Sequence, residues 1–287
     1  MTDGVVVVDK AAGMTSHDVV DRIRRLLGTR RVGHGGTLDP DATGVLIVGV
    51  GKATRFLQFA QAAPKRYTAH VRFGVSTTTQ DRSGEVIERR DASSLTGEAV
   101  AAALPAFTGE IDQVPPMVSA VKIGGERLYA KARRGEDVER AARRVTVHSL
   151  ELQSFEPGAT ADAVLDVRCS GGTYVRTIAH DLGEALGTGA HLTELRRTEA
   201  GGFTLEDAVS LDDLSPSDLL PLAEVVRDLP PVRVSAEDEA LVADGRPLPA
   251  PEVAEEGAAV AVLRDGRLLG VYRRRGAELR AERVVPR

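Results

Sequence analysis

Apolar and polar residues follow one another in blocks through the N-terminal part of the chain. Val5 to Val8 and Val45 to Val50 are unbroken aliphatic runs of strand length, which indicate buried strands. Between them, DVVDRIRRLLG carries its apolar residues at helical spacing, and Ser16 is expected to cap that helix. KATRFLQFAQAA, residues 52–63, predicts a second helix. The chain is therefore expected to begin with a strand, a helix, a strand and a helix.

The middle of the chain has mainly strand patterns. Tyr67 to Phe73 alternates between apolar and polar residues, and Val145 to Phe155 and Ala163 to Cys169 also have the composition of strands. A helix is expected from near Thr177 to around Gly187, and no internal repeat is present. Together these patterns predict an α+β fold, with a mixed, mostly antiparallel sheet flanked by helices.

The pattern changes near residue 228. Glu206 to Asp228 is acidic, and the proline pair that follows it is typical of a domain junction. Beyond it, AVAVL and LLGVY flank a turn at Asp265 and Gly266, which predicts a hairpin. We therefore expect a large domain over residues 1–228 and a small β-rich module over residues 229–287. The C-terminal edge is locally basic, although the chain as a whole is acidic. Its arginines are Arg264, Arg267, Arg273, Arg274, Arg275, Arg280, Arg283 and Arg287.

Composition limits the classes of function. The 287 residues carry a formal net charge of −5, so any nucleic-acid site must be a local basic patch. The single cysteine, Cys169, cannot form an internal disulfide, and no spacing of Cys and His fits a zinc site. No apolar segment reaches the length of a membrane span, and the N-terminus lacks a basic signal-peptide start. These features predict a cytoplasmic protein without a metal.

The stretch VGHGGTLDPDATGVL contains the main candidate for chemistry. The Asp39–Pro40 bond holds Asp39 extended on a tight turn, where its carboxylate could be a nucleophile, a base or a ligand. The same residue could simply form an Asx turn. GHGG could cradle a phosphate, although it matches no common phosphate-binding fingerprint. His34, Asp39 and Asp41 could be metal ligands, but their spacing matches no common metal motif.

Five blocks resemble, in order, the motifs of the TruB family of tRNA pseudouridine synthases. They are DKAAGMTSHDVV, GHGGTLDPDATGVL, KRYTAHVRFG followed by DRSG at residues 81–84, FTGEIDQVPPMVSAVKIGGERLYAKARRG, and CSGGTYVRTIAHDLGEALGTGAHLTELRRTEAGGF. The blocks cover most of the chain from Gly4 to Phe203. The departures are Ala11, where the family usually has Pro, Val118, where it often has Tyr, and the variable positions Gly35 and Asp41.

The resemblance implies a pseudouridine synthase fold and the isomerisation of uridine 55 in the T loop of tRNA to pseudouridine, without a cofactor. It implies that Asp39 is the nucleophile and attacks either the ribose or the base. It also implies that Arg176 pairs with this carboxylate, since a nearby cation keeps a carboxylate ionised. Tyr67 would stack on the flipped uracil and assist proton transfer at C5. Taken alone, Arg176 favours a structural ion pair and Tyr67 favours a residue of the sheet core.

The resemblance also suggests which residues bind the substrate. His34 would contact the RNA near the flipped nucleotide, and Leu195 would form an apolar wall of the pocket. Tyr174 would pack against Tyr67 or the base, and on a strand it would face the same side as Arg176.

Two basic regions are expected to hold the tRNA T stem-loop. The insertion at residues 122–144 is rich in Lys and Arg, and Lys122, Arg133 and Arg134 are its candidate RNA contacts. The C-terminal module resembles an RNA-binding PUA domain, although a purely structural appendage would have the same strand pattern. The enzyme is expected to be a monomer with no obligatory protein partner.

Three other functions remain open from sequence. The chain could be an RNA-binding factor that has lost catalysis, although Asp39, Tyr67 and Arg176 are all present. It could be a guide-RNA-dependent synthase of the same superfamily, although the basic insertion favours a stand-alone enzyme. A metal-dependent hydrolase built on His34 and Asp39 would lose its activity on chelation.

Overall fold

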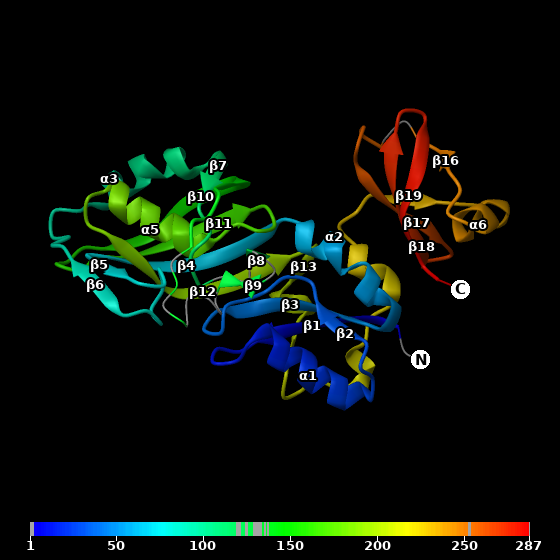
Figure 1. The fold of residues 1–287 in the computed structure, drawn as a ribbon, viewed down its shortest axis with the longest axis horizontal. Coiled ribbons are helices and arrows are strands. Elements are labelled where there is room, and N and C mark those ends of the chain that lie inside the picture. The colour runs from blue at the N-terminus through cyan, green and yellow to red at the C-terminus, as the bar shows by residue number, and fades with distance from the viewer. Residues whose placement is uncertain are drawn as a thin grey trace. The chain divides into compact units, whose positions relative to one another are not determined.

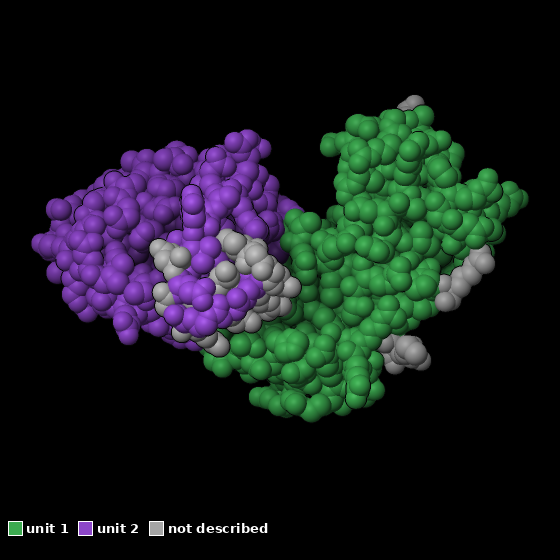
Figure 2. All heavy atoms as spheres, in the orientation of Figure 1, with its two compact units in different colours: residues 1–40, 44–63, 199–287 green, residues 41–43, 64–198 purple. Residues whose placement is uncertain are grey.

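The computed structural model describes residues 3–118, 122–123, 126–128, 134, 136, 138–251 and 254–286 (Figure 1). The chain forms two compact units, each built from segments that are distant in sequence (Figure 2). Unit 1 contains residues 1–40, 44–63 and 199–287, and unit 2 contains residues 41–43 and 64–198.

Unit 1 begins with the predicted elements. Strand β1 (Gly4–Lys10) pairs antiparallel with β3 (Thr43–Val50), so the two aliphatic runs lie side by side in the sheet. The short β2 (Val32–His34) pairs with the other edge of β3, and β14 (Val209–Ser210) pairs parallel with β1. The smaller elements here are β13 (Phe203–Thr204), η3 (Leu205–Asp207), η4 (Pro216–Asp218) and η5 (Leu222–Val226).

Two predictions about helices in unit 1 need correction. Helix α1 (Ser16–Leu27) is capped by Thr15 rather than Ser16, because the Thr15 side chain accepts from the Asp18 N–H in a capping box. Residues 52–63 do not form one helix. They divide into the 3₁₀ turn η1 (Gly51–Arg55) and α2 (Leu57–Ala62), because the backbone tightens at Phe56, whose N–H bonds back to the Ala53 carbonyl.

Unit 2 is an antiparallel sheet with helices packed on it. Its strand order is β12-β4-β11-β10-β7, and helix α5 packs on β4 while α3 packs on β10 (Figure 1). The principal elements are β4 (Lys65–Phe73), α3 (Gly97–Ala103), η2 (Leu104–Phe107), β7 (Gly109–Gln113), β10 (Arg143–Glu156), β11 (Asp162–Cys169), α5 (Val175–Ala185) and β12 (Ala190–Ala200). The described part of unit 2 also contains the hairpin β5 (Val75–Thr77)–β6 (Val86–Arg89) and the pair β8 (Lys122–Ile123)–β9 (Glu126–Arg127).

The mixed, mostly antiparallel sheet flanked by helices is thus confirmed. In the part of the chain described above, no helix is long and apolar enough to cross a membrane.

The C-terminal module is a five-stranded sheet in the order β15-β17-β18-β19-β16 with one helix. Its elements are β15 (Pro231–Arg233), α6 (Ala236–Ala243), β16 (Leu248–Pro249), β17 (Ala259–Arg264), β18 (Arg267–Arg275) and β19 (Glu278–Val284). The predicted hairpin is present, and both of its turn residues, Asp265 and Gly266, have the positive φ that a two-residue turn with this twist requires.

This module shares a hydrophobic core with the N-terminal strands. Ala261, Leu268 and Val271 belong to the same buried cluster as Val5 and Phe56. A second cluster, which includes Val242 and Leu279, lies within the module itself. The boundary at residue 228 stays a prediction, and a truncation there would remove part of the core of unit 1.

The shared core leads to a prediction about the stability of unit 1. Leu268→Ala should lower the free energy of unfolding by about 2–5 kcal/mol, because it deletes a buried side chain. It should also speed amide hydrogen exchange in β1, whereas Leu279→Ala, in the module's own cluster, should act mainly on the module. If Leu268→Ala leaves exchange in β1 unchanged, the module does not support the N-terminal strands.

Candidate active site

The loop that carries Asp39 lies in unit 1 between β2 and β3, and both neighbours of Asp39 are held by residues between the end of β1 and the start of α1. The Leu38 N–H donates to Ser16 Oγ at 2.9 Å, and Ser16 Oγ donates to the Leu38 carbonyl at 3.2 Å. On the other side, the Pro40 carbonyl accepts from Lys10 Nζ at 2.9 Å and from the Gly13 N–H at 3.0 Å. Asp39 itself is half-buried. Its carboxylate therefore projects from a stretch of backbone that is fixed at both ends.

Lys10 is a fully buried cation at the base of this loop. Its Nζ also donates to the carbonyl oxygens of Ala11 at 2.9 Å and Met14 at 2.8 Å. Burying an ammonium group is costly unless its donors are bonded, so these carbonyls must stay near it. Lys10 thereby ties the glycine-containing turn after β1 to Pro40.

In unit 2, Arg176 lies in the first turn of α5. The helix begins at Val175, two residues earlier than predicted, so Tyr174 precedes a helix instead of sharing a strand with Arg176. The two side chains still meet, since the guanidinium carbon of Arg176 lies 5.9 Å from the centre of the Tyr174 ring. Gln113 holds the start of this helix: it accepts from the Tyr174 N–H at 3.0 Å and donates to the Tyr174 carbonyl at 3.2 Å.

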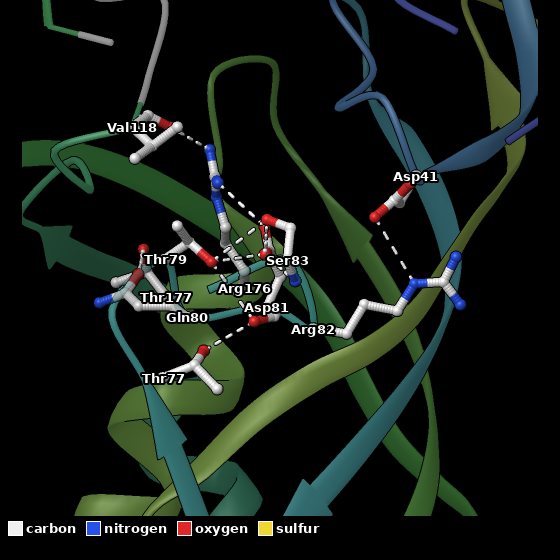
Figure 3. Close-up of polar contacts among 10 residues, drawn as sticks. All are labelled: Asp41, Thr77, Thr79, Gln80, Asp81, Arg82, Ser83, Val118, Arg176 and Thr177. Atoms are coloured by element: carbon white, nitrogen blue, oxygen red, sulfur yellow. Dashed lines mark hydrogen bonds and ion pairs between the residues drawn. The ribbon is translucent and has the colours of Figure 1, made fainter. Parts of the chain in front are cut away.

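The buried guanidinium of Arg176 has an acidic partner that sequence reasoning missed. Its Nη1 lies 3.1 Å from Asp81 Oδ2, and its Nη2 donates to the Val118 carbonyl at 2.6 Å (Figure 3). The other carboxylate oxygen of Asp81 accepts from Thr79 Oγ1 at 2.6 Å and from the N–H and hydroxyl of Ser83. Asp81 therefore holds the loop with one oxygen and Arg176 with the other.

The residue before Asp81 shows how tightly this loop is held. Gln80 has a φ of +63°, which is costly for a residue with a side chain. Its backbone carbonyl accepts from the Leu192 N–H at 3.0 Å, and its amide oxygen accepts from Thr177 Oγ1 at 2.9 Å. The only signal for Asp81 in the sequence was its place in DRSG, where an Asp two residues before a Ser is typical of an Asx turn.

The remaining predicted site residues have these positions. Tyr67 is buried on β4, the strand on which α5 packs, and Leu195 is half-buried on β12. His34 is half-buried at the end of β2, and its carbonyl accepts from Gln61 Nε2. Asp39 and His34 belong to unit 1 and the others to unit 2. The pairing of Arg176 with Asp39 stays a prediction.

The basic insertion is described only in part. Lys122 begins β8, and Arg133 lies outside the described residues. Arg134 donates to both carboxylate oxygens of Glu126 and also to Glu136, so two acids already neutralise it. Its role in RNA binding remains a prediction.

Cys169 is a poor candidate for chemistry. Burial raises the pKa of the Cys169 thiol to about 11, so this thiol stays protonated and is a poor nucleophile near neutral pH. Within the described ranges, no group of three or more His, Cys, Asp or Glu side chains could hold a metal ion.

Comparison with known families gives two adjoining matches. The model for the N-terminal domain of TruB family pseudouridylate synthases matches residues 24–175. The model for the C-terminal domain of tRNA pseudouridylate synthase B matches residues 176–225. Together they span both units.

Similar proteins extend the match along the chain. Proteins named tRNA pseudouridine synthase B are 55% identical in Thermobifida fusca, over 84% of each chain, and 46% identical in Mycobacterium tuberculosis, over 98% of this chain and 95% of the relative. Among solved structures, a Cbf5–Nop10–Gar1 complex contains a chain that aligns with a TM-score of 0.77 at 29% identity, covering 99% of this chain and 85% of that one.

The ion pair between Arg176 and Asp81 should matter for stability. The side chains are 5% and 18% exposed, so Asp81→Ala removes a partner from a buried charge and should cost about 3–5 kcal/mol of unfolding free energy. Asp166→Ala is the matched control, because its partner Arg66 is 51% exposed, and it should cost less than about 1 kcal/mol. Equal losses in urea denaturation would show that burial does not set the strength of the Arg176 pair.

Proposed function

Because the chain belongs to the TruB family of pseudouridylate synthases, we propose that this tRNA pseudouridine synthase acts on uridine 55 in the T loop. The observation that carries the proposal is the 46% identity, along 98% of the chain, to a relative named tRNA pseudouridine synthase B. The held loop around Asp39 supports it, because an isomerase without a cofactor depends on the placement of its own side chains.

The reaction needs no oxidant, reductant or group donor. The bond between C1′ and N1 of the uridine breaks, the uracil rotates, and a bond forms between C1′ and C5. The proton on C5 is lost and N1 regains a proton, so atoms and charge balance. Asp39 supplies the nucleophile that carries the separated fragment, and it attacks either the ribose or the base.

Arg176 and Tyr67 act beside Asp39 in this proposal. Uridine 55 must leave its stack to reach the carboxylate, which costs a few kcal/mol. Tyr67 offers an aromatic face for the flipped uracil and a hydroxyl for proton transfer at C5. Arg176, fixed by Asp81 and by the Val118 carbonyl, supplies the cation that keeps Asp39 ionised. His34, Tyr174 and Leu195 are the proposed contacts to the substrate.

A basic surface on unit 1 supports tRNA binding. It consists of the side chains of Arg25, Arg30, Arg31, Lys52 and Arg55, which are exposed or half-exposed. The Gly51 N–H donates to the Arg31 carbonyl at 2.8 Å, which brings the end of α1 and its following loop next to η1. None of the five makes a salt bridge with a described residue. Such cations are free to neutralise phosphates and release counterions.

Four arginines of the C-terminal module are already paired with acids of the module. Arg264 and Arg267 both pair with Glu239, Arg273 pairs with Glu282, and Arg280 pairs with Glu278. We therefore propose that the basic surface of unit 1 makes phosphate contacts in addition to those of the PUA-like module.

We also propose that the enzyme works alone, as a cytoplasmic monomer. The Cbf5 neighbour was solved in a complex with other proteins, which would favour dependence on partners. The bacterial relatives at 46–55% identity carry the name of a tRNA enzyme and favour the stand-alone alternative. Activity of the purified chain on bare tRNA, unaffected by chelation, would separate it from both the partner-dependent and the metal-dependent alternatives.

Asp39→Asn tests the proposed activity. The change keeps the shape of the side chain but removes the nucleophilic charge, so release of tritium from C5-labelled uridine in a tRNA transcript should fall below detection. Binding of tRNA should stay within about tenfold, or 1.4 kcal/mol. Substantial turnover by Asp39→Asn would exclude Asp39 as the nucleophile, and an inactive wild-type protein would favour the RNA-binding factor.

The basic surface makes a separate prediction. The double variant Arg30→Ala and Arg31→Ala should weaken tRNA binding. The slope of the logarithm of the association constant against the logarithm of the salt concentration should become shallower by about 0.7–0.9 for each phosphate that is no longer neutralised. The control is Arg264→Ala with Arg267→Ala, which removes the same formal charge from residues already paired with Glu239. Equal slopes for the two variants would mean that overall charge, and not this surface, governs binding.

A further inference from the structure

The backbone just before Asp39 has little regular support. Residues 37–39 belong to no helix or strand, and Leu38 is buried. A buried peptide group needs hydrogen-bond partners, and the N–H and carbonyl of Leu38 both bond to the same atom, Ser16 Oγ. This hydroxyl accepts from the N–H and donates to the carbonyl of Leu38. In a sheet, the backbone groups of a neighbouring strand would form these two bonds.

Ser16 is available for this role because another residue caps the helix. Thr15 accepts from the Asp18 N–H at 3.1 Å, and Asp18 reaches back to the Thr15 N–H at 2.7 Å. Thr15 is exposed, whereas Ser16 is only 2% exposed and lies under the loop. The two adjacent hydroxyls thus have different roles: Thr15 begins α1, and Ser16 joins α1 to the residue before Asp39.

We propose that Ser16 is a positioning residue for the nucleophile. It fixes the Leu38 peptide, and the Asp39 carboxylate is attached one residue further along. On the far side, Lys10 and Gly13 fix Pro40. With both neighbours held, the backbone that carries the Asp39 side chain is fixed on either side. The inference rests on the proposed role of Asp39 as nucleophile.

The experiment compares wild type, Ser16→Ala, Ser16→Thr and Thr15→Ala, all assayed below the melting midpoint of the least stable variant. Three quantities are measured: the single-turnover rate constant at saturating tRNA, the tRNA dissociation constant and the thermal midpoint. Ser16→Ala should lower the rate constant by about 10- to 100-fold, because a nucleophile displaced by about 1 Å loses up to that factor. Its dissociation constant should stay close to that of wild type, because the buried Ser16 side chain offers no surface to the RNA.

The other two variants separate positioning from stability. Thr15→Ala should lower the thermal midpoint, because it removes a helix cap, and should keep the wild-type rate constant. Ser16→Thr retains the hydroxyl and should recover most of the rate. The proposal is overturned if Ser16→Ala reacts at the wild-type rate, or if Ser16→Ala and Thr15→Ala slow the reaction equally. An inactive wild-type protein would instead overturn the proposed function.

Discussion

The structure of this site depends on how a loop without regular secondary structure keeps its buried peptide groups bonded. Around Asp39 the partners are Ser16 Oγ on Leu38, and Lys10 Nζ with the Gly13 N–H on Pro40. All three come from the short stretch between Lys10, the last residue of β1, and Ser16, the first residue of α1. Because an unpaired buried polar group is costly, the loop cannot move away from this segment without losing stability. The hydrogen bonds that fold the loop therefore also fix the backbone that carries the Asp39 carboxylate.

Unit 2 holds Arg176 in a comparable way. Arg176 is buried, which is tolerable only because Asp81 and the Val118 carbonyl accept from it. Asp81 is oriented in turn by Thr79 and Ser83, while Gln113 fixes the start of α5. Asp39 and Arg176, the charged residues with a proposed role in the reaction, are thus each attached to backbone that is fixed by hydrogen bonds from other residues. Such support suits the proposed isomerisation, whose chemistry would come from the side chains of this chain.

The sequence predicted the strands well because their signals are local. β1, β3, β4, β10 and β11 are apolar or alternating runs, and the Asp265–Gly266 turn has the residues that its backbone needs. Ser16, Asp81 and Arg264 show what local patterns miss. Ser16 was expected to be a cap, but its partner lies 22 residues away at Leu38. Asp81 and Arg176 are 95 residues apart, and Arg264 is neutralised by Glu239, 25 residues before it. These pairings depend on tertiary structure, which no short window of sequence contains.

The central claim is that this chain alone converts one uridine of the tRNA T loop, with catalysis carried by its own side chains. The most direct test is to incubate the purified protein with an unmodified tRNA transcript in the presence of a chelator, and then to map pseudouridine at every uridine. A single modified position, uridine 55, is the predicted result. Pseudouridine elsewhere, or formed only when a guide RNA or a second protein is added, would contradict it.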